Sequence, residues 1–87
     1  IEERERIFGE LNGRPGIQVF PSRANFILIK TPHPAGSVFD ALYAEGVLVR
    51  DVSRYPLLNR ALRVSIGKPD ENTRFLSTLD RVLETLA

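Results

Sequence analysis

The apolar side chains near the C-terminal end of the chain repeat with the spacing of one helix face. Between Phe75 and Leu86 they recur every three or four positions, which is the period of an amphipathic helix. Such a helix has to bury its apolar stripe against another layer. The preceding segment, Leu62 to Ile66, alternates apolar and polar residues and predicts a strand with one covered face. The two segments together favour a helix packed on a sheet.

The other segments extend this arrangement along the chain. Helices are predicted over residues 1–12, 37–45 and 69–86, and strands over residues 17–20, 25–30, 47–50 and 61–66. The run 25–30 is nearly all apolar, so we expect it to be central in the sheet or covered on both faces. Ser37 to Asp40 resembles a capping box, and Gly46 stands where that helix should end. The expected fold class is a two-layer α/β sandwich of order α-β-β-α-β-β-α, with a small, mostly antiparallel sheet and helices on one face.

The first predicted helix is already under way at the first residue. Ile1, Phe8 and Leu11 are expected to share its buried face, with Ile7 beside them. No Ser, Thr, Asp or Asn precedes Ile1 as an N-cap, and the sequence contains no methionine. We therefore expect the chain to be a piece of a longer protein. The start is charged and has no apolar signal-peptide segment.

Composition excludes several classes of function. Twelve Lys and Arg against eleven Asp and Glu give a net charge of +1, which argues against a dedicated nucleic-acid or membrane-surface binder. Cysteine is absent, so disulfides, thiol catalysis and thiolate metal sites are excluded. No apolar run approaches the roughly 18–20 residues that span a bilayer. These features are compatible with a soluble protein of the cytoplasm.

Most catalytic templates find no match in the sequence. His33, the single histidine, lies between two prolines with no partner for a metal site or a catalytic base. Lys30 and Lys68 do not lie in apolar patterns that would favour Schiff-base chemistry. Ser65 has no base within reach along the sequence, and the glycines form no phosphate-binding loop. We therefore expect no catalytic residue and no metal ligand in this chain.

Two arginines differ from this background. Arg63 lies in the middle of a predicted strand, and Arg50 ends another. A strand interior is a costly place for a charge unless that face is wet or an anion binds there. A guanidinium offers a rigid fork of donors that suits a carboxylate or a phosphate. Two readings remain open: an anion site, or exposed arginines paired with Asp51 or Glu71.

Three segments resemble the C-terminal part of the histidinol-phosphate aminotransferases, a family of pyridoxal-phosphate (PLP) enzymes of fold type I. They are Pro21 to Leu28, Gly46 to Asp51, and Leu62 to Asn72. Their order and spacing make the resemblance specific, and it covers essentially the whole chain. It implies that residues 1–87 are the C-terminal small domain of an aminotransferase whose large PLP-binding domain is absent. The implied reaction converts histidinol phosphate and 2-oxoglutarate to imidazole acetol phosphate and glutamate in histidine biosynthesis.

The resemblance also implies roles for particular residues. Arg63 matches the arginine that binds the anionic group of the substrates, which are histidinol phosphate and glutamate or 2-oxoglutarate. Arg50 matches a second arginine near the same pocket. Asn25 matches an asparagine of the small domain, in a substrate-binding or structural role. Tyr55 lies in the connection that would face the site.

The Schiff-base lysine and the other groups that hold PLP belong, by the same resemblance, to the large domain. The 87 residues should therefore neither bind PLP tightly nor transaminate by themselves. The full enzyme is implied to be a cytoplasmic homodimer with no nucleic-acid or membrane partner. Lys68 stands where relatives often have Thr, which should weaken the start of the last helix by up to about 1 kcal/mol.

A different class of function stays open. The predicted β-α-β-β-α core is close to a ferredoxin-like plait, so the chain could be a free-standing ligand-sensing or RNA-binding module. RNA-binding plaits display aromatic side chains on their central strands for base stacking. Here the central strands offer only Phe26. A purely structural interaction domain is the third alternative.

Overall fold

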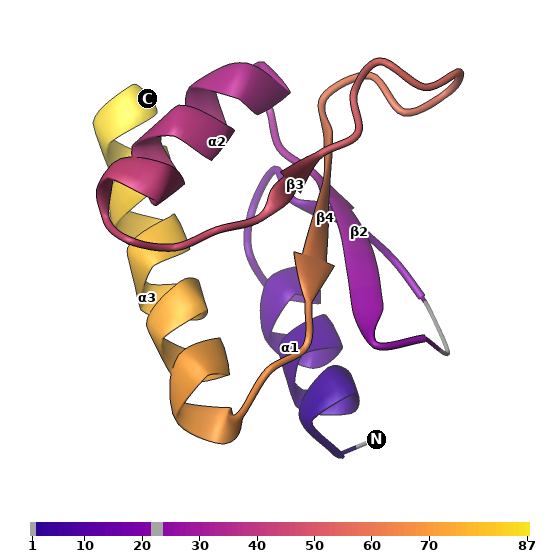
Figure 1. Cartoon of the computed structure of the whole chain (residues 1–87), viewed down its shortest axis with the longest axis vertical. Helices are drawn as coiled ribbons and strands as arrows, with labels where there is room; N and C mark the ends of the chain where they lie inside the picture. The colour runs from indigo at the N-terminus through magenta and orange to yellow at the C-terminus, as the bar shows by residue number, and fades with distance from the viewer. Residues whose placement is uncertain (1, 22–23) are drawn as a thin grey trace.

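The computed structural model describes residues 2–21 and 24–87. Its elements follow one another in the predicted order (Figure 1). They are α1 (Glu2–Asn12), β1 (Gln18–Phe20), β2 (Phe26–Lys30), α2 (Ala35–Ala44), β3 (Arg50–Asp51), β4 (Ala61–Ser65) and α3 (Pro69–Leu86). Ile1, predicted to be buried by the first helix, and Ser22 and Arg23 of the first motif lie outside the described residues.

The four strands form one antiparallel sheet in the order β1-β2-β4-β3. The three helices cover one of its faces, as predicted, and a single apolar core lies between the two layers. From the sheet this core takes alternate residues of β2 and β4, and from the helices it takes the apolar stripes. Its fully buried members include Ile7 and Leu11 of α1, Ile27 and Ile29 of β2, Leu42 of α2, Leu62 of β4 and Leu79 of α3. The expected two-layer α/β sandwich is confirmed.

The opposite face of the sheet carries no helix among the described residues. Phe26, Leu28 and Arg63 lie there half-buried, and Ser65 is exposed. The apolar run of β2 is therefore central in the sheet, one of the two predicted arrangements, but only one of its faces is covered. We call the uncovered side, made by these four residues with Phe20 and Arg50, the open face.

The second helix begins earlier than predicted. Pro34 is its N-cap, and the Pro34 carbonyl accepts hydrogen bonds from the N–H groups of Ser37 and Val38. The capping box predicted at Ser37 is therefore wrong, because the fixed φ of proline lets the chain enter the helix before that residue. At the other end the prediction is confirmed. Gly46 has a φ of 82° and ends the helix in the left-handed conformation that glycine favours.

The third strand was predicted over residues 47–50, and this prediction is wrong in its bounds. Pairing with β4 begins only at Arg50 and continues to Asp51. The N–H of Val47 donates to the Leu42 carbonyl at 2.9 Å, so it belongs to the end of α2. Val49 turns into the core and is 7% exposed. Residues 47–49 thus stay with the helix layer and separate from the end of β4.

Asn72 joins the end of β4 to two helices. Its side chain, 3% exposed, accepts from the N–H of Gly67 and donates to the Gly67 carbonyl, both at 2.9 Å. It also donates to the Glu3 carboxylate of α1 at 3.0 Å. The Glu71 carboxylate accepts from the N–H of Lys68, whose own side chain has no acceptor atom to cap α3. These bonds fix the turn that follows β4.

Candidate functional site

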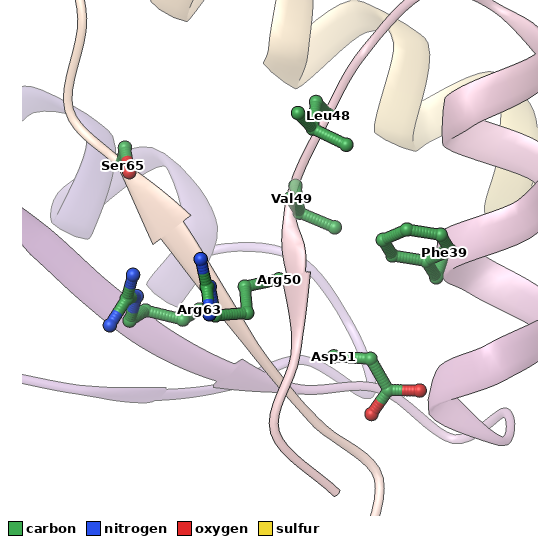
Figure 2. A pocket seen from close by; sticks show the side chains of 7 residues that line it. All are labelled: Phe39, Leu48, Val49, Arg50, Asp51, Arg63 and Ser65. Atoms are coloured by element: carbon green, nitrogen blue, oxygen red, sulfur yellow. The ribbon is translucent and has the colours of Figure 1, made fainter.

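The sheet register places the two candidate arginines side by side. Arg50 of β3 lies directly opposite Arg63 of β4. Figure 2 shows both side chains extending to the same side of the sheet, whereas Asp51 points the other way, toward α2. Like charges in direct cross-strand opposition destabilise a sheet. The pair therefore needs an explanation outside folding.

No acidic side chain of the described residues neutralises this pair. The Asp51 carboxylate instead accepts hydrogen bonds from the hydroxyl of Ser53 at 2.6 Å and from its N–H at 2.9 Å. These bonds, the hydroxyl foremost, hold the pKa of Asp51 below its usual value. Glu71 is occupied at the start of α3. The alternative that Arg63 or Arg50 pairs with Asp51 or Glu71 is wrong.

The arginines line an open cleft of about 480 Å³. It opens where residues 47–49 separate from the end of β4, so that Leu48 and Val49 lie across from Ser65 (Figure 2). Phe39 of α2 and Asp51 complete the lining. The cleft therefore has a cationic side on the open face, and a side toward α2 that is apolar except for the Asp51 carboxylate.

An aromatic ring lies beneath one of the two cations. The Arg63 guanidinium carbon is 5.1 Å from the centre of the Phe26 ring. This distance lies within the range of a cation–π interaction. In the part of the chain that the structure describes, neither the Arg63 nor the Arg50 side chain makes a hydrogen bond or ion pair. The in-plane donors of both guanidinium groups are thus available to a ligand.

Tyr55 lies close enough to sense these charges but does not line the cleft. Its hydroxyl accepts a hydrogen bond from Arg54 at 3.3 Å, and this bond is the main reason that the pKa of Tyr55 is lowered. The positive charges of Arg50 and Arg63 act in the same direction. The phenol is half exposed, in the connection between β3 and β4.

Asn25 is not brought into the cleft lining. Its side chain is exposed, and its backbone carbonyl accepts from the N–H of Ile66 at 2.7 Å, which extends the pairing of β2 with β4 by one step. The structure thus brings Arg50 and Arg63 together and leaves Asn25 beside the end of the strand pair. Of the lining residues, Ser65 could have been found from the sequence, since it alternates with Arg63 on one strand.

The lysines and the histidine that the sequence analysis set aside remain apart from the cleft. Lys30 donates to the carbonyl of Leu57 at 3.0 Å, and Lys68 lies exposed at the start of α3. His33 is tied through its backbone to the Thr31 hydroxyl. Across residues 2–21 and 24–87, no group of three His, Cys, Asp or Glu side chains could hold a metal ion. Among the described helices, none combines the length and apolar character needed to cross a membrane.

Comparison with known proteins finds relatives that are named histidinol-phosphate aminotransferase. The chain is 46% identical over 87 residues to the histidinol-phosphate aminotransferase of Aquifex aeolicus. The aligned residues are 100% of this chain and 25% of that enzyme. It is 48% identical over 83 residues to the enzyme of the same name from Chlorobium luteolum, covering 95% of the chain and 23% of that enzyme. The chain therefore spans about a quarter of the length of these relatives. No protein-family model matches it.

Solved structures agree with the sequence comparison. The histidinol-phosphate aminotransferase of Clostridium acetobutylicum superposes with a TM-score of 0.87 at 30% identity, over 97% of this chain and 26% of that one. The L-threonine-O-3-phosphate decarboxylase of Porphyromonas gingivalis gives 0.89 at 26% identity, over 95% of this chain and 26% of that one. The histidinol-phosphate aminotransferase of Sinorhizobium meliloti, solved in complex with pyridoxal-5'-phosphate, superposes with a TM-score of 0.83 at 27% identity. The match covers 99% of this chain and 24% of that one. By sequence and by fold, the chain is homologous over its whole length to one segment of the histidinol-phosphate aminotransferases.

Proposed function

We propose that residues 1–87 form the C-terminal small domain of a PLP-dependent aminotransferase that acts on histidinol phosphate and 2-oxoglutarate. Identities of 46% and 48% to enzymes of that name support the substrate assignment. In this proposal the domain supplies Arg63 and Arg50 to the substrate's anionic group, and Asn25 lies near the site in a structural role. Histidine biosynthesis in the cytoplasm is the corresponding cellular role.

The directly opposed arginine pair carries this proposal. Arg50 and Arg63 lie opposite each other across β3 and β4, and no acid among the described residues forms an ion pair with either. A phosphate or carboxylate bound there removes the repulsion and accepts bonds from both forks. The two substrates must occupy one site in turn, so a cationic cleft that accepts either anion suits both half-reactions.

The chain's own residues do not fit the covalent anchoring of PLP. That chemistry needs a lysine amine in the site. Neither Lys30, which is bonded to the Leu57 carbonyl, nor Lys68 lines the cleft. PLP is therefore assigned to the large domain of the same polypeptide, and this fragment alone is inactive. The full enzyme is proposed to be a homodimer.

The test uses the full-length protein encoded by the gene. It should transaminate histidinol phosphate, and Arg63→Lys should raise the KM for histidinol phosphate and for 2-oxoglutarate by roughly ten-fold or more, because a point charge replaces a two-pronged donor. Arg81→Lys is the matched control, since Arg81 is paired with Glu45 on the helix side of the molecule. Unchanged KM values for Arg63→Lys would remove Arg63 from the site.

The structural likeness to a decarboxylase favours one second candidate. The Porphyromonas gingivalis enzyme is named for a substrate that also carries a phosphate ester. The same arginine pair suits such a substrate, so the cleft does not separate the two activities. Product analysis does: glutamate formed from 2-oxoglutarate indicates transamination, and carbon dioxide released from a phosphorylated amino acid indicates decarboxylation.

The RNA-binding alternative has less support. Base stacking needs free aromatic faces on the sheet. On the open face, Phe26 already carries Arg63 at 5.1 Å and Phe20 carries Lys30 at 5.8 Å. Titration with single-stranded RNA at physiological salt tests this alternative, and binding tighter than micromolar would favour it.

A further inference from the structure

We propose that Phe26 is a positioning residue of the anion site, whose ring holds the Arg63 guanidinium in place while leaving all of its donors free. The inference rests on the proposed function, because it concerns the same arginine. It adds a residue whose side chain reaches the ligand only through Arg63 and does not itself line the cleft.

The register of the two central strands creates this contact. Phe26 pairs with Ser65, and Leu28 pairs with Arg63, so Phe26 and Arg63 are diagonal neighbours on the open face. Diagonal neighbours are within reach when one side chain is aromatic and the other long. The guanidinium carbon lies 5.1 Å from the ring centre, and the ring is half-buried against the sheet.

An aromatic partner suits a ligand-binding arginine better than an acidic one. A carboxylate would accept from the guanidinium edge and occupy the donors that a substrate needs. A ring attracts the cation through its π face, and the N–H groups lie in the guanidinium plane. A side chain ordered before binding also loses less freedom when the ligand arrives. Phe26 can therefore preorganise Arg63 without competing with the substrate.

Phe20 offers a matched comparison on the same face. Its ring carries Lys30 at 5.8 Å, but the Lys30 ammonium donates to the Leu57 carbonyl. That cation is thus held by another group and lies outside the cleft. Removing the Phe20 ring should perturb the open face as much as removing the Phe26 ring, without touching Arg63.

The experiment compares Phe26→Leu with Phe20→Leu in the full-length enzyme. Phe26→Leu should raise the KM for both substrates by about two- to five-fold, with a smaller change in kcat, and should raise the inhibition constant of inorganic phosphate by a similar factor. Phe26→Tyr keeps a π face and should restore both values. Phe20→Leu should leave them at the wild-type level.

Several outcomes would overturn the inference. If Arg63→Lys raises the KM values and Phe26→Leu leaves them at the wild-type level, the inference about Phe26 is overturned and the proposed function stays intact. Equal effects of Phe20→Leu and Phe26→Leu, or no rescue by Phe26→Tyr, would assign the effect to packing. If Phe26→Leu fails to fold, a trifluorinated phenylalanine in place of Phe26 keeps the shape and weakens the π face, and an unchanged KM there overturns the inference. Unchanged KM values for Arg63→Lys would instead overturn the proposed anion site.

Discussion

The two faces of the central strand pair differ although the same ten residues build them. On the covered face Ile27, Ile29 and Leu62 are completely buried. On the open face Phe26 and Arg63 are half-buried. Because side chains alternate along a strand, one register fixes both the core and the arginine site. A slip of one residue would exchange them, so the core specifies the position of Arg63.

The faces also differ in how their groups are satisfied. No polar side-chain atom buried in the described residues lacks a hydrogen-bond partner. The open face, by contrast, holds two opposed cations without an acid. The comparison indicates that stability comes from the covered face and that binding capacity is concentrated on the open face.

The largest effect should come from the covered face. Leu62→Ala removes a fully buried side chain and should lower the free energy of unfolding by about 2–5 kcal/mol. Leu28→Ala, on the same strand pair but the open face, should cost clearly less because its side chain is only half-buried. Urea unfolding of the two variants measures the difference. Equal losses would mean that the open face is part of the core.

A smaller loss should follow from breaking the bonds of Asn72. Asn72→Ala leaves Gly67 without two partners at the end of β4 and should lower the free energy of unfolding by about 1–3 kcal/mol. Thr73→Ala is the control, since the exposed Thr73 hydroxyl accepts only one bond, from Arg6 at 3.2 Å. Denaturant unfolding of both variants tests this, and similar values for the two would show that the buried network is dispensable.

Substitution in the arginine pair should raise the free energy of unfolding, whereas substitution in the core lowers it. Arg50→Gln relieves a cross-strand like-charge contact and should raise the free energy of unfolding by about 0.2–1 kcal/mol at low salt. The same change should weaken phosphate binding. Arg50→Lys keeps the repulsion and should give no gain in stability. Paired unfolding and phosphate titrations measure both quantities, and a stability loss in Arg50→Gln would contradict the division between the faces.

The sequence predicted the helices, the central strands and the sidedness of Arg63 because those signals are local periods. The apolar spacing of α3 and the alternation of β4 each require one covered face. The bounds of β3 could not be read in the same way. Val47 and Val49 favour a strand by composition, but the end of α2 takes the N–H of Val47 and the core takes Val49.

The cleft forms because residues 47–49 pack with α2 and the core and do not pair with β4. Its apolar side therefore could not be predicted from the sequence. Leu48 lines it only because residues 47–49 leave β4. The pairing of Arg50 with Arg63 was equally hidden, since the sequence does not state which residues of β3 and β4 lie opposite. Ser37 shows a local signal that failed, because the proline three residues earlier starts the helix first.

The smallest effect is a pH dependence on the helix side. The pKa of Glu3 lies below its ordinary value of 4.5, first because Arg6 donates to the carboxylate and second because Asn72 does. The unfolded chain therefore takes up a proton at a higher pH than the folded one. The stabilisation from ionised Glu3 is complete above about pH 4.5 and is lost as the pH falls through the lower pKa of the folded state.

Glu3→Gln removes this titration, so the free energy of unfolding of the variant should approach that of the wild type as the pH drops below 4.5. Glu2→Gln, which removes an exposed carboxylate from the same helix turn, is the matched control for the loss of one charge. A wild-type advantage that stays constant down to about pH 3 would mean that the Glu3 bonds do not depend on its charge. In that case the Asn72 contact to α1 would be an ordinary neutral hydrogen bond, while the bonds of Asn72 to Gly67 and of Glu71 to Lys68 would still hold the turn after β4.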